Sequence, residues 1–185
     1  RRDVILVQGI EPSFRWRRFS TEIVELAEDL GVGAVVTLGA LMADVAHTRE
    51  IPVTATSENE ATIHRYDLER STYEGPTGIT GVLADAVDQA GLTSISCWVA
   101  VPHYAGVAPS PKATLALLAR VESLIEVPIE AGALPEAARE WQATIDEIAA
   151  DDDEVTEYVQ ALEEAQDTAG LPQASGDAIA REFEA

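Results

Sequence analysis

The sequence predicts an α/β fold built on a parallel sheet. Three short apolar runs, at residues 4–7, 34–38 and 95–101, are typical of buried strands, and amphipathic helical patterns lie between them. Strands that alternate with helices are typical of parallel sheets, whose ligands bind outside the carboxyl ends of the strands. Polar, aromatic and charged residues follow each apolar run. The sequence therefore predicts a candidate site at one rim of this sheet.

The first half of the chain contains the first two strands and the first helix. After the run at 4–7, Ser20 is expected to open a helix that Gly31 ends, with apolar residues on one face. The run at 34–38 lacks polar alternation, so we expect both of its faces to be covered. A short strand at 52–56 and a short helix at 61–66 are expected to follow.

The middle of the chain adds two further helices with a strand between them. The glycine-rich loop 73–81 leads into a helix that Gly91 stops, and a strong strand covers 94–101. Ser110 is a good N-cap and Pro111 suits the first position of the next helix, which extends to Ile125.

Beyond Pro128 the composition changes, and two amphipathic helices are expected at 135–149 and 154–169. The acidic joint Asp151–Asp153 is expected to cap the second of them. We therefore expect an α/β core over 1–128, a helical hairpin over 129–170 and a tail over 171–185 with a short helical segment. Because the first strand begins at once, we expect the chain to be part of a longer protein whose N-terminal part is missing.

The formal net charge is −21, and it is unevenly distributed. Residues 1–112 hold 9 basic and 15 acidic side chains, whereas residues 113–185 hold 3 basic and 18 acidic ones. A negative field of this size repels phosphate groups, so we expect no nucleic-acid partner and no binding to anionic membrane surfaces. The sequence shows no signal peptide and no apolar run long enough to span a bilayer, which favours the cytoplasm. Cys97, the single cysteine, is expected to be a small buried residue.

Two clusters of candidate residues follow the first two apolar runs. Glu11, Arg15 and Trp16 could hold an anionic or planar ligand, because they combine a carboxylate, a guanidinium and an indole. Asp44, His47 and Arg49 follow the second run, and His47 could act as a general base or as a metal ligand. The structural alternatives are an ion pair over a packed Trp16 for the first cluster, and a polar loop that caps backbone groups for the second.

Two further clusters lie later in the chain. Glu74 and Thr77 belong to the glycine-rich loop, whose backbone N–H groups could approach an anion; the alternative is a tight turn in which Thr77 caps the helix. His103 and Tyr104 follow the third run and could face the same crevice as His47, with Lys112 a turn into the next helix. The alternative here is that Tyr104 only packs and Lys112 is only solvated.

The sequence contains no G-x-S-x-G elbow, CxxC pair, H-E-x-x-H motif or kinase signature, and no histidines are paired at metal-ligand spacing, so we expect no metal and no cofactor. The arrangement of strands predicts that Glu11, His47 and His103 lie on one rim. A site shared by all four clusters depends on that placement.

Four blocks in the sequence resemble the actinobacterial branch of the PAC2 family, which is named for the proteasome assembly chaperones. They are EPSFRWRRF at 11–19, LGALMADVAHTR at 38–49, YEGPTGITGVL at 73–83 and VPHYAGVAPSPKATLALL at 101–118. The resemblance implies a phosphorylase-like, three-layer α/β/α sandwich with a mostly parallel sheet and a C-terminal helical pair. It also implies homo-oligomers, with trimers as one expected form, and a protein partner.

Two functions are compatible with these observations. The first is a non-enzymatic protein-binding or assembly-factor module, which the resemblance and the acidic helical pair favour. The second is a small-molecule binding protein or enzyme that acts on an anionic or nucleoside-like ligand at the strand carboxyl ends. A third alternative is a purely structural oligomer in which the polar clusters lie at subunit contacts.

Overall fold

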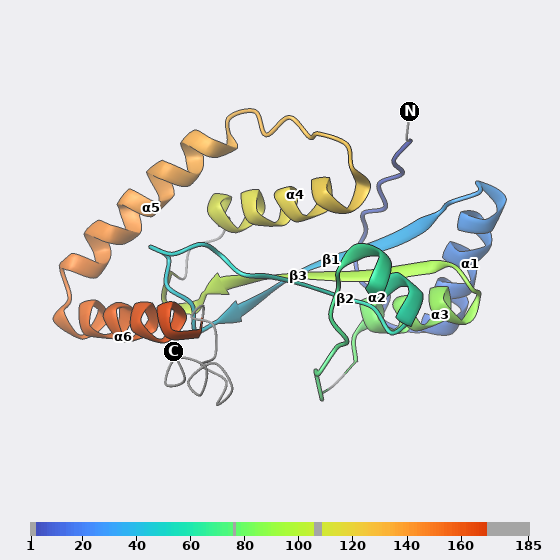
Figure 1. Cartoon of the computed structure of the whole chain (residues 1–185), viewed down its shortest axis with the longest axis horizontal. Coiled ribbons are helices and arrows are strands. Elements are labelled where there is room, and N and C mark those ends of the chain that lie inside the picture. Colours follow the sequence, from blue (N-terminus) through green and yellow to red (C-terminus); the bar gives the residue numbers. More distant parts are fainter. Residues whose placement is uncertain (1–2, 76, 106–108, 170–185) are drawn as a thin grey trace, which may run out of the picture.

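The structure is a computed structural model and describes residues 3–75, 77–105 and 109–169 (Figure 1). Its elements, in chain order, are α1 (Trp16–Asp29), β1 (Ala34–Ala43), β2 (Val53–Thr56), α2 (Glu60–Tyr66), α3 (Ile79–Gln89), β3 (Thr93–Pro102), the 3₁₀ turn η1 (His103–Ala105), α4 (Pro111–Ile125), α5 (Leu134–Ala150) and α6 (Asp153–Ala169). The predicted α/β class is confirmed. The predicted tail at 171–185 lies outside the described residues.

The sheet formed by the described residues has the order β1-β3-β2 and is mixed. β1 pairs with β3 in parallel, with Ala43 opposite Pro102 at their carboxyl ends, whereas β2 pairs with β3 antiparallel. The expectation of a mostly parallel sheet is therefore not met. The reason is the short connection 44–52, which returns the chain beside β3 without the helical crossover that a parallel strand needs.

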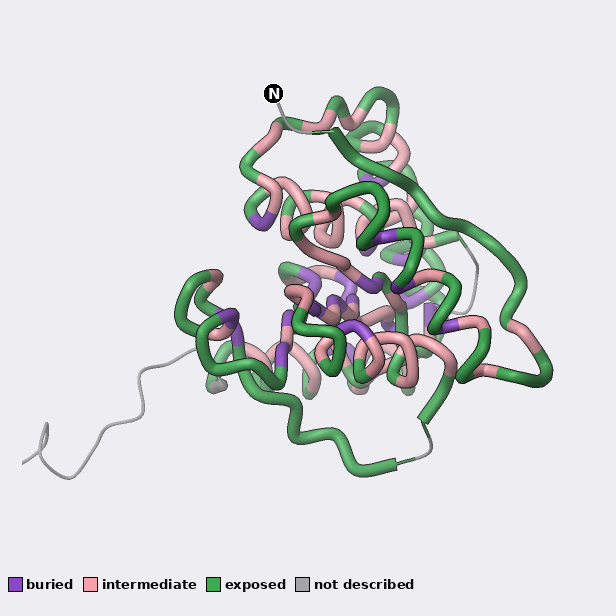
Figure 2. Tube along the Cα trace, turned by 90° about the vertical axis from the view of Figure 1, so that its right-hand side faces the viewer, coloured by how far each residue is buried: buried purple, intermediate pink, exposed green. Residues whose placement is uncertain are grey.

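The apolar run at 4–7 forms no strand, so this prediction is wrong. Its four side chains are between 53% and 89% exposed, and no backbone partner holds them in a sheet. Figure 2 shows buried segments gathered in the middle of the molecule, whereas segment 3–11 is exposed along its whole length. A strand exists through hydrogen bonds to a neighbour, and an apolar pattern alone does not supply that neighbour.

The core lies around β3, the central strand. Ile95 and Cys97 are fully buried there and pack with Leu68 and Leu124, which come from the segment after α2 and from α4. The predicted burial of Cys97 is confirmed, and burial raises the pKa of its thiol. β1 is less covered, since Leu38 remains 49% exposed, so the expectation that both faces of this strand are covered is wrong at that position.

Gly39 permits a close contact within the sheet. It lies opposite Trp98 in the β1–β3 register, and a Cβ added to it would lie 2.5 Å from the Trp98 ring. The indole Nε1 of Trp98 donates to the Ser96 hydroxyl at 3.1 Å. A side chain at position 39 would therefore displace an indole that packs across the parallel pair.

Most helices begin and end close to their predicted positions. The Ser110 hydroxyl accepts from the Ala113 amide at 3.4 Å, which confirms the predicted cap of α4, and Asp152 accepts from Glu154 at the start of α6. α1 is the exception, because it begins at Trp16 and not at Ser20. Ser20 lies buried inside the helix, and Arg15, at φ 60°, occupies the N-cap position.

Among the described residues, no helix is both long enough and apolar enough to cross a membrane.

Candidate functional site

The carboxyl ends of β1 and β3 bring two of the predicted clusters together. Because these strands are parallel and in register through Ala43 and Pro102, the residues that follow them emerge side by side. The Nδ1 atom of His103 lies 3.2 Å from the Asp44 carboxylate. We call the residues of this end the rim; they are Asp44, His47, Arg49, His103, Tyr104 and Lys112.

His47 is the most buried polar group of the rim, with 1% of its surface exposed. Its backbone amide donates to the Tyr104 hydroxyl oxygen at 2.8 Å, and its Nδ1 lies 2.6 Å from the same oxygen. Its Nε2 lies 2.9 Å from a carboxylate oxygen of Asp146 in α5. A carboxylate can only accept a hydrogen bond, so Nε2 carries a proton and donates it to Asp146.

Lys112 joins the same network from the first turn of α4. Its ammonium group donates to the His47 carbonyl oxygen at 2.5 Å and to the Gln142 side chain at 2.7 Å. Burial lowers the pKa of Lys112, while the negative charges of Asp146 and Glu50 oppose that shift. The alternative of a merely solvated lysine is therefore wrong.

Arg49 binds α6 through its whole guanidinium group. Nε and Nη2 each donate to a different oxygen of Asp167 at 2.8 Å, and Nη1 donates to Glu163 at 3.1 Å. These hydrogen bonds raise the pKa of Arg49 and lower that of Asp167. The Thr48 hydroxyl also donates to Glu163.

The side-chain amide of Gln166 binds the backbone of the loop after β1 at two points. Its oxygen accepts from the Ala46 amide at 3.1 Å, and its nitrogen donates to the Glu50 carbonyl oxygen at 2.9 Å. A single α6 side chain therefore bridges Ala46 and Glu50 within this loop.

Aromatic rings complete the contact between the rim and α6. Tyr158 of α6 donates to Asp44 at 3.1 Å, and its ring meets those of His103 and Tyr104 edge to face, with centroids 5.5 and 5.8 Å away. Burial raises the pKa of Tyr104 and of Tyr158. The hydrogen bond to Asp44 raises the pKa of Tyr158 further. Both hydroxyls therefore remain protonated, as these hydrogen bonds require.

The partners of the rim were missing from the sequence prediction. They all belong to the helical hairpin or to the loop itself: Gln142, Asp146, Tyr158, Glu163, Gln166, Asp167 and Thr48. The only signal for them in the sequence was the excess of acidic residues after residue 112, opposite the more basic first part of the chain.

A second group of predicted residues lies around the start of α3. The Glu11 carboxylate accepts from the Ile79 amide at 3.2 Å and so caps this helix. The N-cap residue is Gly78, which has no side chain for the task, so the alternative that Thr77 caps the helix is wrong. Thr77 and Glu74 are both exposed.

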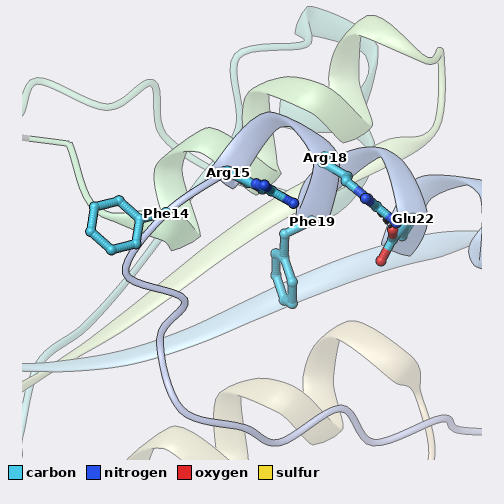
Figure 3. Close-up of a pocket in the computed structure, with 5 residues that line it drawn as sticks. All are labelled: Phe14, Arg15, Arg18, Phe19 and Glu22. Atoms are coloured by element: carbon cyan, nitrogen blue, oxygen red, sulfur yellow. Dashed lines mark hydrogen bonds and ion pairs between the residues drawn. The ribbon is translucent and has the colours of Figure 1, made fainter.

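The remaining members of this group surround the start of α1. The Trp16 indole donates to the Pro12 carbonyl oxygen. Arg15 lines an open hollow with Phe14, Arg18, Phe19 and Glu22 (Figure 3), and Phe14 is 84% exposed. Arg18 is paired with Glu22 at 2.8 Å. The guanidinium of Arg15 has no hydrogen-bond or ion-pair partner among the described residues.

The predicted residues thus fall into two groups with different chemistry. Three rim side chains, His47, Arg49 and Lys112, are hydrogen-bonded to α5 or α6, while the hollow at α1 presents a guanidinium and an aromatic ring to solvent. No described hydrogen bond connects the groups, and Glu11 contacts α3 whereas His47 contacts α5. Within residues 3–75, 77–105 and 109–169, no group of His, Cys, Asp and Glu side chains is arranged to hold a metal ion.

Solved structures share this fold. A PAC2 family protein from Streptomyces avermitilis is 52% identical with a TM-score of 0.76, and the match covers 82% of this chain and 63% of that one. A proteasome-assembly chaperone homologue from Mycobacterium tuberculosis is 44% identical with a TM-score of 0.73, over 82% of this chain and 64% of that one. The chain therefore spans less than two thirds of the length of these two relatives. No curated protein matches it.

More distant structures resemble the chain in fold alone. An archaeal proteasome activator from Pyrococcus furiosus is 20% identical with a TM-score of 0.58, over 72% of this chain and 57% of that one. The family model of PAC2 matches residues 1–149, which include the rim and α5 and stop before α6. With this match over most of the chain and two closely similar actinobacterial structures, the chain belongs to the PAC2 family.

Proposed function

We propose that the chain is a non-enzymatic, protein-binding module of the assembly-factor type. The observation that carries this proposal is the use of rim side chains to hold helices. His47, Arg49 and Lys112 could have bound a small ligand at the strand ends, but they instead hold the helical hairpin. Side chains that hold helices through hydrogen bonds and ion pairs are typical of a protein–protein contact.

The surface of the hairpin and the relatives support the same proposal. Outward-facing side chains of α5 and α6 are predominantly acidic, for example Glu140, Glu147 and Glu157. Such a surface steers association with basic protein surfaces and disfavours nucleic acid. One relative is described as a proteasome-assembly chaperone homologue, and another as an archaeal homologue of a proteasome-assembly chaperone.

Affinity purification of the tagged full-length protein from its native cells tests this role. We expect a defined set of proteins to co-purify, and we expect the double variant Glu147→Lys/Glu157→Lys to lose them. Glu25→Lys/Glu28→Lys, two charge reversals on the exposed face of α1, is the matched control and should keep them. We would abandon the proposal if no protein were enriched and if deletion of residues 130–169 changed no complex.

A small anionic or nucleoside-like ligand remains the second candidate function, and the hollow at α1 favours it. Arg15 offers a guanidinium with no described partner there, in a hollow that the rings of Phe14 and Phe19 also line. A cation and aromatic rings that line one hollow suit a planar or carboxylate-bearing ligand.

A thermal-shift panel of nucleosides, phosphates and carboxylates separates the two functions. A ligand at one hundred times its dissociation constant should add about 2.7 kcal/mol to the free energy of unfolding. Arg15→Ala should abolish that shift, whereas Arg17→Ala should retain it. The absence of any shift with the full-length protein would speak against a ligand site.

We also propose, on the strength of the family, that the protein acts as a homo-oligomer in the cytoplasm. Exposed Leu38, Leu41 and Met42 on β1 offer apolar area for contacts between copies. We further propose a three-layer core over 1–128 with the hairpin 129–170 appended to it. Analytical ultracentrifugation tests the first proposal, and limited proteolysis in the connection 126–133 tests the second.

A further inference from the structure

Helix α6 is attached to the rim through polar groups, with little apolar burial. Val159 is its one described side chain with less than a tenth of its surface exposed, whereas Tyr158, Glu163, Gln166 and Asp167 all hydrogen-bond to the segment 44–50. Hydrogen bonds and ion pairs of this kind exchange readily for water, and each one adds little net stability. Their geometry is nevertheless specific, because each of these donors meets an acceptor at hydrogen-bond distance.

The joint between α5 and α6 contains no glycine and no proline. Only Asp151 and Asp152 separate the two helices, and Asp151 keeps a right-handed helical backbone at φ −82°, ψ −8°. Asp152 holds the bend, because its carboxylate accepts from the amides of Glu154 and Val155. A change in the backbone at this joint would therefore join α5 and α6 into one helix of about 54 Å.

The apolar pattern of the two helices continues across the joint without a break in phase. Apolar residues recur at alternating spacings of four and three from α5 into α6, and Asp152 is the single polar residue within the series. The positions are Leu134, Ala138, Trp141, Ile145, Ile148, Asp152, Val155, Val159 and Leu162. A strict repeat of this kind is typical of a helix that packs along its whole length against a partner helix. In the bent form Ile148, next to the joint, remains 53% exposed.

We propose that a second copy of this chain is a partner of the rim and that α6 is exchanged between the two copies. In the exchanged form the joint is straight, and the two long helices lie antiparallel. The α6 helix of each copy packs on α5 of the other and places Glu163, Gln166 and Asp167 on the other copy's Arg49 loop. The contacts that α6 makes with the rim and with α5 are then made between copies, as in domain swapping, while the contacts of α5 with its own rim are kept.

A second copy of the chain fits the rim because its α6 carries the groups that complement the rim in charge and hydrogen bonding. The rim pairs its Arg49 fork with two carboxylates, Glu163 and Asp167, and pairs the ends of its loop with one amide, Gln166. Each further copy of the chain carries the same three groups at the same spacing. Asp152 would face its counterpart near the two-fold axis, so its charge opposes the exchange and keeps the bent form favoured.

Two charge-reversed copies provide the test. One full-length chain carries Arg49→Glu, and the other carries Glu163→Arg/Asp167→Arg. In either variant alone, the residue at position 49 and those at positions 163 and 167 carry like charges, so the rim repels α6. In an exchanged mixed dimer, the glutamate at position 49 of one copy meets the two arginines of the other copy's α6. The second contact of that dimer pairs Arg49 with the native Glu163 and Asp167. Native mass spectrometry of the mixture should show a mixed dimer several-fold above the level of either homodimer.

The joint supplies a second and independent test. Asp152→Ala removes the cap and the central charge, so it should raise the dimer fraction of the purified chain, measured by light scattering. Asp153→Ala, the same change one residue further on, is the matched control and should have a smaller effect. Circular dichroism confirms that each variant keeps its helices.

Two results would overturn the exchange. One is a mixture that contains only monomers although both variants are folded, because α6 then stays on its own rim. The other is a dimer that responds neither to Asp152→Ala nor to the charge reversals, because the contact then lies elsewhere, as at the edge of β1. The inference rests on the proposed protein-binding role, and its failure would leave that role standing, since the role is tested with other proteins from native cells.

Discussion

β3 and α6 are attached to the rest of the molecule by different forces. β3 lies at the centre of the sheet, and its Ile95, Cys97 and Val99 are buried among apolar side chains. α6 lies at the end of the same sheet (Figure 1), but it is held mainly by hydrogen bonds and ion pairs. One element is fixed by the hydrophobic effect, and the other is positioned by matched polar groups.

The difference distinguishes the apolar contacts that stabilise the fold from the polar contacts through which α6 could change its partner. Apolar burial contributes about 25 cal/mol per Å² and does not depend on direction, so the core tolerates no rearrangement without a large loss. A polar contact at a half-exposed surface contributes little net free energy but depends strongly on geometry. The α6 attachment is therefore specific in geometry but contributes little net stability, whereas the sheet is stabilised by buried apolar surface.

The largest effect is expected in the core. Ile95→Ala removes a fully buried side chain from the central strand and should lower the free energy of unfolding by about 2–5 kcal/mol. Urea denaturation measures it. Ile148→Ala, the same change at a half-exposed position of α5, is the control and should cost much less. An equal loss for both variants would remove the distinction between the core and the hairpin.

A smaller effect is expected where the hairpin meets the buried histidine. Asp146→Ala leaves the buried Nε2–H group of His47 without its acceptor and should cost about 1–3 kcal/mol. Denaturation of this variant is compared with that of Glu147→Ala, an exposed neighbour with the same change of charge. If both variants matched the unmodified chain, the Asp146 contact would be irrelevant to stability.

Loss of the arginine fork should free α6 and leave the core intact. Arg49→Ala removes the ion pairs to Glu163 and Asp167, so hydrogen exchange of the α6 amides should accelerate while β3 stays protected. High salt should accelerate the same α6 amides in the unmodified chain, because it screens half-exposed charges. Arg17→Ala is the control. Equal acceleration in β3 would show that the two regions unfold together.

The smallest effect is expected from acid. Arg49 lowers the pKa of the Asp167 carboxyl in the folded chain, so this pair contributes stability above the ordinary aspartate pKa of about 3.9 and loses it as the pH falls through the lowered value. The near-ultraviolet signal of the Tyr158 contact should therefore weaken as the solution is acidified. In Asp167→Asn this pH dependence should be reduced, whereas Asp153→Asn should retain it.

The strands and helices could be predicted where a local pattern was sufficient. Ser110 followed by Pro111 correctly predicts the start of α4, and Asp152 correctly predicts the start of α6. The run at 4–7 has an equally clear strand pattern and yet forms no strand, because pairing requires a neighbour that a local pattern cannot provide. The prediction that Ser20 starts the first helix was wrong for a similar reason, since a good capping residue can also lie within a helix.

The candidate site could be predicted in part. The rule that polar residues gather at the carboxyl ends of parallel strands correctly brings Asp44, His47, His103 and Tyr104 together. It fails for Glu11, whose run forms no strand and whose carboxylate caps α3 instead. It also says nothing of Asp146, which lies 99 residues from His47 along the chain and depends on where the hairpin folds back.

The sequence by itself determined the α/β class, the positions of most helices and strands, the acidic character of the C-terminal half and the family, because these depend on periodicity, composition and local motifs. The tertiary structure alone decided the mixed direction of the sheet, the separation of Glu11 from His47 and the pairing of the rim with α6. Each of those three results requires two distant segments to meet, and their distance in space follows from the packing of the whole chain and not from any spacing along it.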